Sequence, residues 1–292
     1  MPQLIDDAFL RQLYSLRFVT RERRHGRLSG LHASPRAGVS LEFSDYRPYS
    51  PGDDFRYIDW NVFGRLDRIV VRRYVHESDL PIYLLVDLSA SMGVGEPTKA
   101  FYASRLAAGL AYLGLQGFDR VGVFPFTERV LPTSAQPRHG LRQMTHVLRA
   151  LQDVRPVGKT SLDRAVRQFL SMSHENGLVV VISDFLGPGF RDGVARLRHR
   201  GYEIVVIQTL TPEEIRPSDT GALQFVDVES LRQETMTVGH VTLAEYEDRF
   251  REHQLSLANF LRERTVPYFV APTDRPVERL IHEDLRRGGV LK

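Results

Sequence analysis

Oxygen-bearing side chains cluster in one short segment directly after an apolar run. Asp87, Ser89 and Ser91 follow residues 82–86 and are spaced two positions apart. In an extended chain Asp87 and Ser91 would lie about 13 Å apart, at roughly 3.3 Å per residue, so one ion could not reach both. They can share a ligand only if the chain curls after the apolar run, which the small and glycine residues that follow permit.

Two further oxygen donors stand in other predicted loops. Thr160 precedes a segment of helical period, and Asp184 follows the apolar run 178–182. Taken singly, such residues also serve as turn or cap residues. Together they predict a hard site for Mg²⁺ or Mn²⁺, because the oxygens come without His or Cys. With few charged ligands the ion would stay electron-poor, and we expect it to accept a carboxylate from a protein partner.

The elements that must position these residues are those of an α/β fold. Short, continuous apolar runs alternate with segments of helical period, which is typical of buried parallel strands and their crossover helices. We expect a doubly wound, mostly parallel, Rossmann-like sheet, with loops opening at the carboxyl ends of its strands. The predicted strands are 82–86, 121–126, 178–182, 204–207 and 268–270. The predicted helices are 98–116, 140–151, 161–173, 190–200 and 242–264, with Thr242 and Glu245 spaced as a capping box.

The first 79 residues follow a different pattern. Leucines and a valine three residues apart predict an amphipathic helix within 5–20. Alternation of apolar residues begins at Val39, a turn is expected at 50–53, and a β-rich stretch follows at 69–71. We therefore predict an N-terminal helix and β-rich appended region over 1–79 and the α/β domain over 80–292.

Composition excludes several classes of protein. There are no cysteines, so disulfides, thiolate zinc sites and cysteine nucleophiles are excluded. No apolar run reaches the roughly 18 residues of a membrane helix and the start lacks a signal-peptide pattern, so we expect a cytoplasmic location. The net charge is +3, and the basic run 21–27 has no interleaved aromatic residues. These features favour a solvated surface over a nucleic-acid contact.

The metal-site residues resemble a known motif. Asp87, Ser89 and Ser91, with Thr160 and Asp184 downstream, are similar to the metal-ion-dependent adhesion site (MIDAS) of von Willebrand factor A domains. The resemblance implies that the first four surround the ion, while Asp184 acts through water. It also implies a von Willebrand factor A-like fold.

A second resemblance covers Glu42–Phe43, Asp45–Tyr49 and Gly52–Trp60. These segments look like the hallmark of the bacterial "domain of unknown function 58" family, whose members carry a von Willebrand factor A-like domain. The resemblance implies a MoxR-type AAA+ ATPase as partner, in chaperone-like assembly or remodelling. From the residues themselves we expect a structural role, with a turn, ion pairs, and Phe55 and Trp60 in a core, in preference to direct contact with a partner.

The alternative to a binding or adaptor module is an enzyme, a Mg-dependent phosphoester or nucleotide hydrolase. Residues 158–161 look like the end of a phosphate-binding P-loop, but Asp153 stands where that loop needs glycine. The serines also lack the frame of a nucleophile elbow, and no His-Glu-x-x-His occurs. We therefore predict that the chain is not an enzyme.

Overall fold

The computed structural model describes residues 4–19, 41–49, 58–66, 68–76, 80–152, 155–172, 175–226, 228 and 232–292. The chain divides into two units. One joins Met1–Thr20 to Leu80–Lys292, and the other is Arg21–Asp79.

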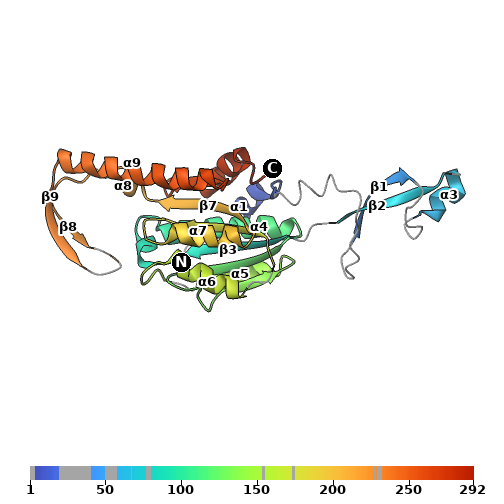
Figure 1. The fold of residues 1–292 in the computed structure, drawn as a ribbon, viewed down its shortest axis with the longest axis horizontal. Coiled ribbons are helices and arrows are strands. Elements are labelled where there is room, and N and C mark those ends of the chain that lie inside the picture. Colours follow the sequence, from blue (N-terminus) through green and yellow to red (C-terminus); the bar gives the residue numbers. More distant parts are fainter. Residues whose placement is uncertain are drawn as a thin grey trace. The chain divides into compact units, whose positions relative to one another are not determined.

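A six-stranded sheet forms the centre of the first unit (Figure 1). Its order is β10-β7-β6-β3-β4-β5, and every neighbouring pair is parallel except β4 and β5. The strands are β3 (Pro81–Asp87), β4 (Arg120–Phe126), β5 (Ala135–Arg138), β6 (Leu178–Ser183), β7 (Glu203–Leu210) and β10 (Tyr268–Pro272). The predicted doubly wound, mostly parallel α/β fold is confirmed, and it agrees with the expected von Willebrand factor A-like class. The short edge strand β5 was not predicted.

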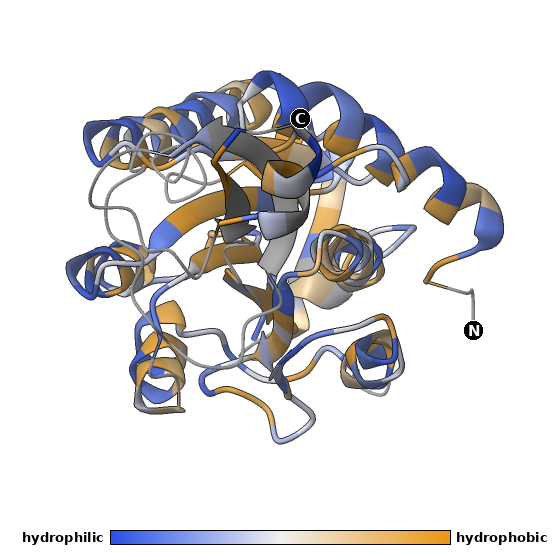
Figure 2. Cartoon of the chain, turned by 90° about the vertical axis from the view of Figure 1, so that its right-hand side faces the viewer, coloured by the Kyte–Doolittle hydropathy of each residue, from blue (hydrophilic) through white to orange (hydrophobic). Residues whose placement is uncertain are grey.

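Helices cover both faces of this sheet, and each face has its own apolar core. The helices are α1 (Asp7–Leu13), α4 (Lys99–Gln116), α5 (Gln143–Gln152), α6 (Leu162–Met172), α7 (Phe190–His199), α8 (Pro212–Ile215), α9 (His240–Glu263) and α10 (Val277–Arg279), with short turns η2 (Ala90–Gly93) and η3 (Leu280–Leu285). Leu84 packs with α4 and α5, whereas its neighbour Leu85 packs with α6 and α7. This follows from the alternation of side chains along a strand. Hydrophilic residues lie on the outer faces of the helices (Figure 2).

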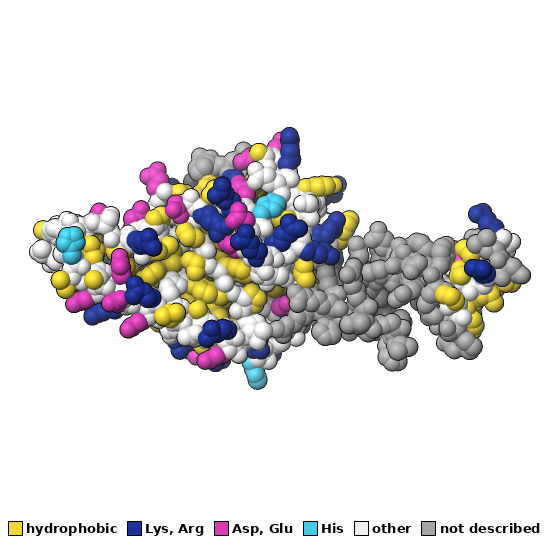
Figure 3. Space-filling view, turned by 90° about the horizontal axis from the view of Figure 1, so that it is seen from above, with side chains coloured by type: hydrophobic (Ala, Val, Ile, Leu, Met, Phe, Trp, Pro, Cys, Tyr) yellow, Lys and Arg dark blue, Asp and Glu magenta, His cyan; other side chains and the backbone are white. Residues whose placement is uncertain are grey.

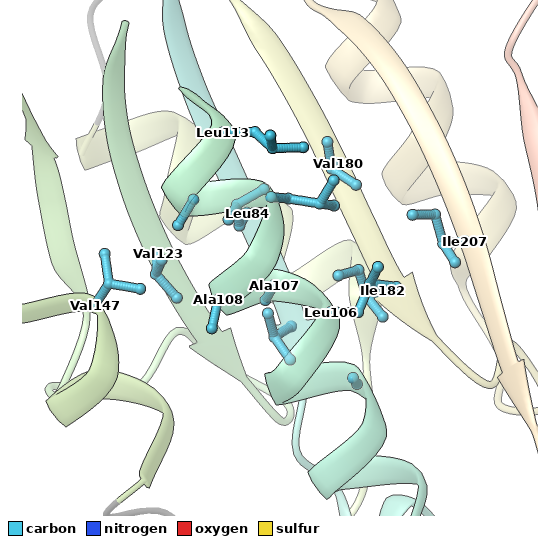
Figure 4. Packing of buried hydrophobic residues seen from close by; sticks show 14 of the residues in the cluster. Leu84, Leu106, Ala107, Ala108, Leu113, Val123, Val147, Val180, Ile182 and Ile207 are labelled. Carbon is cyan, nitrogen blue, oxygen red and sulfur yellow. The ribbon is translucent and has the colours of Figure 1, made fainter. Parts of the chain in front are cut away.

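Helix α4 is the central helix of the first core. Leu106 and Ala107 lie against Leu84 of β3 and Ile182 of β6 (Figure 4). The N-terminal helix joins the same core, since a Cβ on Gly109 of α4 would lie 2.8 Å from the Phe9 ring. Residues 4–19 thus belong to the α/β unit, so the predicted boundary after residue 79 does not separate them from it.

The second unit pairs β1 (Leu41–Pro48) with β2 (Val70–His76) in antiparallel fashion and carries the short helix α3 (Trp60–Leu66). Trp60 is 61% exposed, so the expectation that it lies in a core was wrong. The turn at 50–53, the hallmark residues 52–57 and the basic run 21–27 lie outside the described residues.

Between β7 and α9 the chain forms α8 and an antiparallel hairpin, β8 (Gly221–Val226) with β9 (Gln233–Val238). A capping box occurs at Thr211 and Glu214. The predicted box at Thr242 and Glu245 does not start α9, whose N-cap is Gly239. Among the residues that the structure describes, no helix combines the length and apolar character needed to cross a bilayer.

Candidate metal centre

The first loop of the candidate site begins at Asp87, the last residue of the wholly buried strand β3. The chain curls there as expected: the Ser89 backbone N–H donates to Asp87 Oδ1 at 2.9 Å. The turn η2 follows and brings Ser91 Oγ to 3.2 Å from Ser89 Oγ. Residues that an extended chain would separate are thereby brought to one place.

Two other loops meet the first at Asp87. The Thr160 hydroxyl donates to Asp87 Oδ2 at 2.9 Å, and the Ser183 hydroxyl donates to the same oxygen at 2.7 Å. Backbone hydrogen bonds join the loops as well, from Ala90 N to Gly158 O at 2.9 Å and from Val157 N to Leu88 O at 3.2 Å. The predicted convergence of loops after β3, before α6 and after β6 is confirmed.

Asp184 adds a second buried carboxylate and is held from both sides. Its Oδ1 accepts the Leu186 backbone N–H at 3.2 Å, and its Oδ2 accepts the Lys99 ammonium at 2.9 Å. Lys99 is fully buried and also pairs with Glu214 of α8. Asp184 therefore stands between the Asp87 cluster and a buried lysine.

The electrostatics at Asp87 are those of a buried carboxylate beside a second negative charge. Burial, and then the negative charge of Asp184, raise its pKa from 3.8 to about 6, although hydrogen bonds from Ser183 and Ser89 lower it. Desolvation and a like charge both disfavour the ionised form. A bound cation would relieve both effects.

Two pairs of oxygens each have the spacing of neighbouring ligands on a hard ion. Neighbouring ligands of an octahedral Mg²⁺, each at about 2.1 Å, lie about 3 Å apart. The two serine hydroxyls and the pair of Thr160 Oγ1 with Asp87 Oδ2 have separations of 3.2 Å and 2.9 Å. Within the described ranges no group of three or more His, Cys, Asp or Glu could hold a metal, so a metal here would depend on hydroxyl ligands.

A close contact holds the third loop against the second. A Cβ on Gly187 would lie 2.5 Å from the Thr160 methyl group, which is closer than real Cβ contacts. Glycine at this position therefore lets the segment after Asp184 pass directly beside Thr160.

Ser183, Lys99 and Glu214 were not among the residues predicted for the site. Ser183 directly precedes Asp184 at the end of an apolar run, which is a weak signal. Lys99 offered a clearer one, because a lysine in the first turn of a helix is opposed by the helix dipole. A nearby carboxylate offsets this unfavourable interaction, which is typically about 0.3–1 kcal/mol.

The sequence matches a known family over most of its length. A family model described as "Protein of unknown function DUF58" covers residues 45–256. The chain belongs to this family. Uncharacterized proteins of Mycobacterium tuberculosis and Mycobacterium bovis are each 27% identical over 277 residues, which is 93% of this chain and 87% of theirs.

Several solved structures share part of the DUF58 chain's architecture. The conserved hypothetical protein BatB from Bacteroides thetaiotaomicron is 13% identical, with a TM-score of 0.44 over 72% of this chain and 98% of its own. An aerotolerance-related membrane protein from Bacteroides fragilis gives 0.42, with 13% identity and the same coverage. Manganese-loaded TRAP protein from Plasmodium vivax gives 0.35, with 23% identity over 45% of this chain and 57% of its own.

Proposed function

We propose that this DUF58 chain is a protein-binding module that depends on a divalent cation, Mg²⁺ or Mn²⁺. Asp87, Ser89, Ser91 and Thr160 would hold the ion, with Asp184 beside them. The supporting observation is the meeting of three loops at one buried carboxylate, where hydroxyl oxygens outnumber charged ones. A bound cation would supply a Lewis-acidic site for a carboxylate of the partner.

The surface around the site supports a protein as the partner. Each of the three loops carries an exposed apolar side chain close in sequence to a predicted ligand: Val94 (40% exposed), Val157 (62%) and Leu186 (44%). Apolar side chains next to a polar anchor are typical of protein interfaces. The partner segment would thus carry an acidic residue with apolar neighbours.

For the identity of the partner, the family resemblance favours a MoxR-type AAA+ ATPase, in chaperone-like assembly or remodelling. A pull-down from native lysate, with Mg²⁺ or with EDTA, tests this. We expect the ATPase to be recovered by the wild type only when Mg²⁺ is present. Recovery in EDTA, or equal recovery by Asp87→Ala, would contradict metal-dependent capture.

Calorimetry with Mn²⁺ tests the ion site itself. Asp87→Ala should abolish binding, because it removes the carboxylate on which the loops converge. Asp219→Ala is the matched control, since Asp219 is exposed in the segment after α8. It should bind Mn²⁺ like the wild type. Unchanged Mn²⁺ affinity in a folded Asp87→Ala variant would refute the site.

The hydrolase alternative gains no support from the described geometry. Residues 158–161 follow helix α5 in the chain, whereas a P-loop follows a strand. Phosphoester or ATP turnover by the pure protein, lost in Asp87→Ala, would favour the enzyme over the binding module.

A further inference from the structure

Lys99 is a costly residue at its position. It is the first residue of α4, directly after the N-cap Thr98, and its side chain is fully buried. A cation there opposes the helix dipole, and taking an ammonium group out of water costs several kcal/mol. Its retention requires partners of opposite charge.

Those partners are Asp184, which follows β6, and Glu214 of α8. The ammonium donates to Asp184 Oδ2 at 2.9 Å and also to Glu214 Oε1. The other oxygen of Glu214 accepts the Thr211 backbone N–H at 2.9 Å, which closes the capping box of α8. Both carboxylates are therefore fixed toward Lys99.

The charges of this group are informative. With Asp87, Asp184 and Glu214 ionised, three carboxylates and one ammonium leave two net negative charges. One divalent cation would cancel them. Without Lys99, the loaded site would remain negative and would repel an incoming carboxylate.

We propose that Lys99 determines what the loaded site binds: it weakens the hold on the divalent cation but makes the bound cation available to a partner's carboxylate. It does so by neutralising one unit of negative charge beside the ion. This inference rests on the proposed function. It makes Lys99 a specificity-determining residue that acts through its charge, not an ion ligand.

The test measures the affinity of the full-length protein for Mn²⁺ and the affinity of the Mn²⁺-loaded protein for a carboxylate. The proposal predicts that these two affinities change in opposite directions. Mn²⁺ binding is followed by calorimetry. Carboxylate binding is followed with acetate, which lowers the water-proton relaxation of the Mn²⁺-loaded protein when it displaces a bound water. Acetamide is the uncharged control ligand.

Lys99→Met should bind Mn²⁺ at least about tenfold more tightly, because the repulsion between the ammonium and the cation is gone. It should bind acetate about tenfold more weakly, because the attraction between the ammonium and the carboxylate is gone. Glu214→Gln should change both affinities in the opposite direction. Arg105→Met, which removes a cation farther along α4 that pairs with Glu278, should change neither. Weakening of both affinities in Lys99→Met, or no change in either, would overturn the proposal.

The double variant Lys99→Met with Glu214→Gln restores the net charge and leaves one carboxylate, Asp184, without its ammonium partner instead of two. It should return both affinities to within a few-fold of the wild type. If it instead keeps the Lys99→Met values, charge is not the determinant and the proposal fails. Absence of Mn²⁺ binding by the wild type would refute the proposed function itself, whereas the other failures concern Lys99 alone.

Discussion

Asp87 concentrates the contacts of the candidate site in one side chain. Its Oδ2 accepts two hydroxyl donors from different loops, and its Oδ1 accepts the backbone N–H of Ser89. These hydrogen bonds favour the ionised carboxylate, but burial and Asp184 outweigh them and raise its pKa. The charged form of Asp87 is therefore disfavoured by its surroundings.

The pKa of Asp87 predicts how the stability of the metal-free protein depends on pH. The folded-state pKa of about 6 exceeds the ordinary 3.8, so between these pH values the folded state binds more protons than the unfolded state. The free energy of unfolding therefore falls as the pH rises from 3.8 to about 6. The loss should be on the order of 3 kcal/mol between pH 4 and pH 7. Chemical denaturation of the wild type and Asp87→Asn in metal-free buffer measures the difference.

Asp87→Asn removes this titration but keeps the shape of the side chain. The difference in unfolding free energy between wild type and Asp87→Asn should change between pH 4 and pH 7. Added Mg²⁺ should make this change smaller. A constant difference from pH 4 to pH 7 would contradict the assigned environment of Asp87.

At the scale of elements, the site depends on how closely its loops approach one another. Gly187→Ala should lower the affinity for Mn²⁺ at least several-fold, because its Cβ would push Thr160 away from Asp87. Gly239→Ala is the matched control, since nothing lies within 4 Å of an added Cβ there. Calorimetry compares the two. Equal affinities in both variants would show that the third loop does not position Thr160.

Much of the element pattern could be predicted because buried strands and amphipathic helices have distinct periods. Each of the five predicted strands lies within an observed strand. β5 is short, lies at the edge and contains Pro137, so it lacks that signal. The β8–β9 hairpin is mostly exposed, so burial did not impose an apolar pattern on it.

The site was predictable only in part for a similar reason. The carboxyl ends of β3 and β6 share an edge of the sheet, and α6, which leads into β6, begins at that edge, so the nearness of Asp87 to Thr160 follows from topology. The partner of Lys99 does not, because Glu214 lies 115 residues away and its position depends on the capping box of α8. Metal binding by the predicted residues remains a prediction.

At the scale of the whole molecule, the hairpin and the first turns of α9 contribute little to the core. The buried residues of α9 are Leu257 and Leu261, near its C-terminal end. The exposed hydrophobic side chains of this helix include Val241, Tyr246 and Leu255. Hydrophobic side chains gather on the face of the molecule that is seen from above (Figure 3). Stability of the α/β unit therefore depends on the far end of α9.

Removing most of the hairpin tests whether the hairpin contributes little to the stability of the α/β unit. Gly221 pairs with Val238, so a two-residue Asn-Gly turn can replace residues 222–237. The melting temperature should shift by only a few degrees, and Mn²⁺ affinity should not change. Leu257→Ala should instead cost about 2–5 kcal/mol of stability. Thermal and chemical denaturation distinguish the two, and a larger loss from the hairpin replacement would contradict this account.

The most direct measurement is a crystal soaked in Mn²⁺ and examined by anomalous scattering. We expect one peak between the three loops, about 2 Å from the hydroxyl oxygens of Ser89 and Ser91 and adjacent to Asp87 and Thr160. If the loops stay joined by the hydrogen bonds at Asp87 and no anomalous peak lies among them at saturating Mn²⁺, the proposed ion site is contradicted.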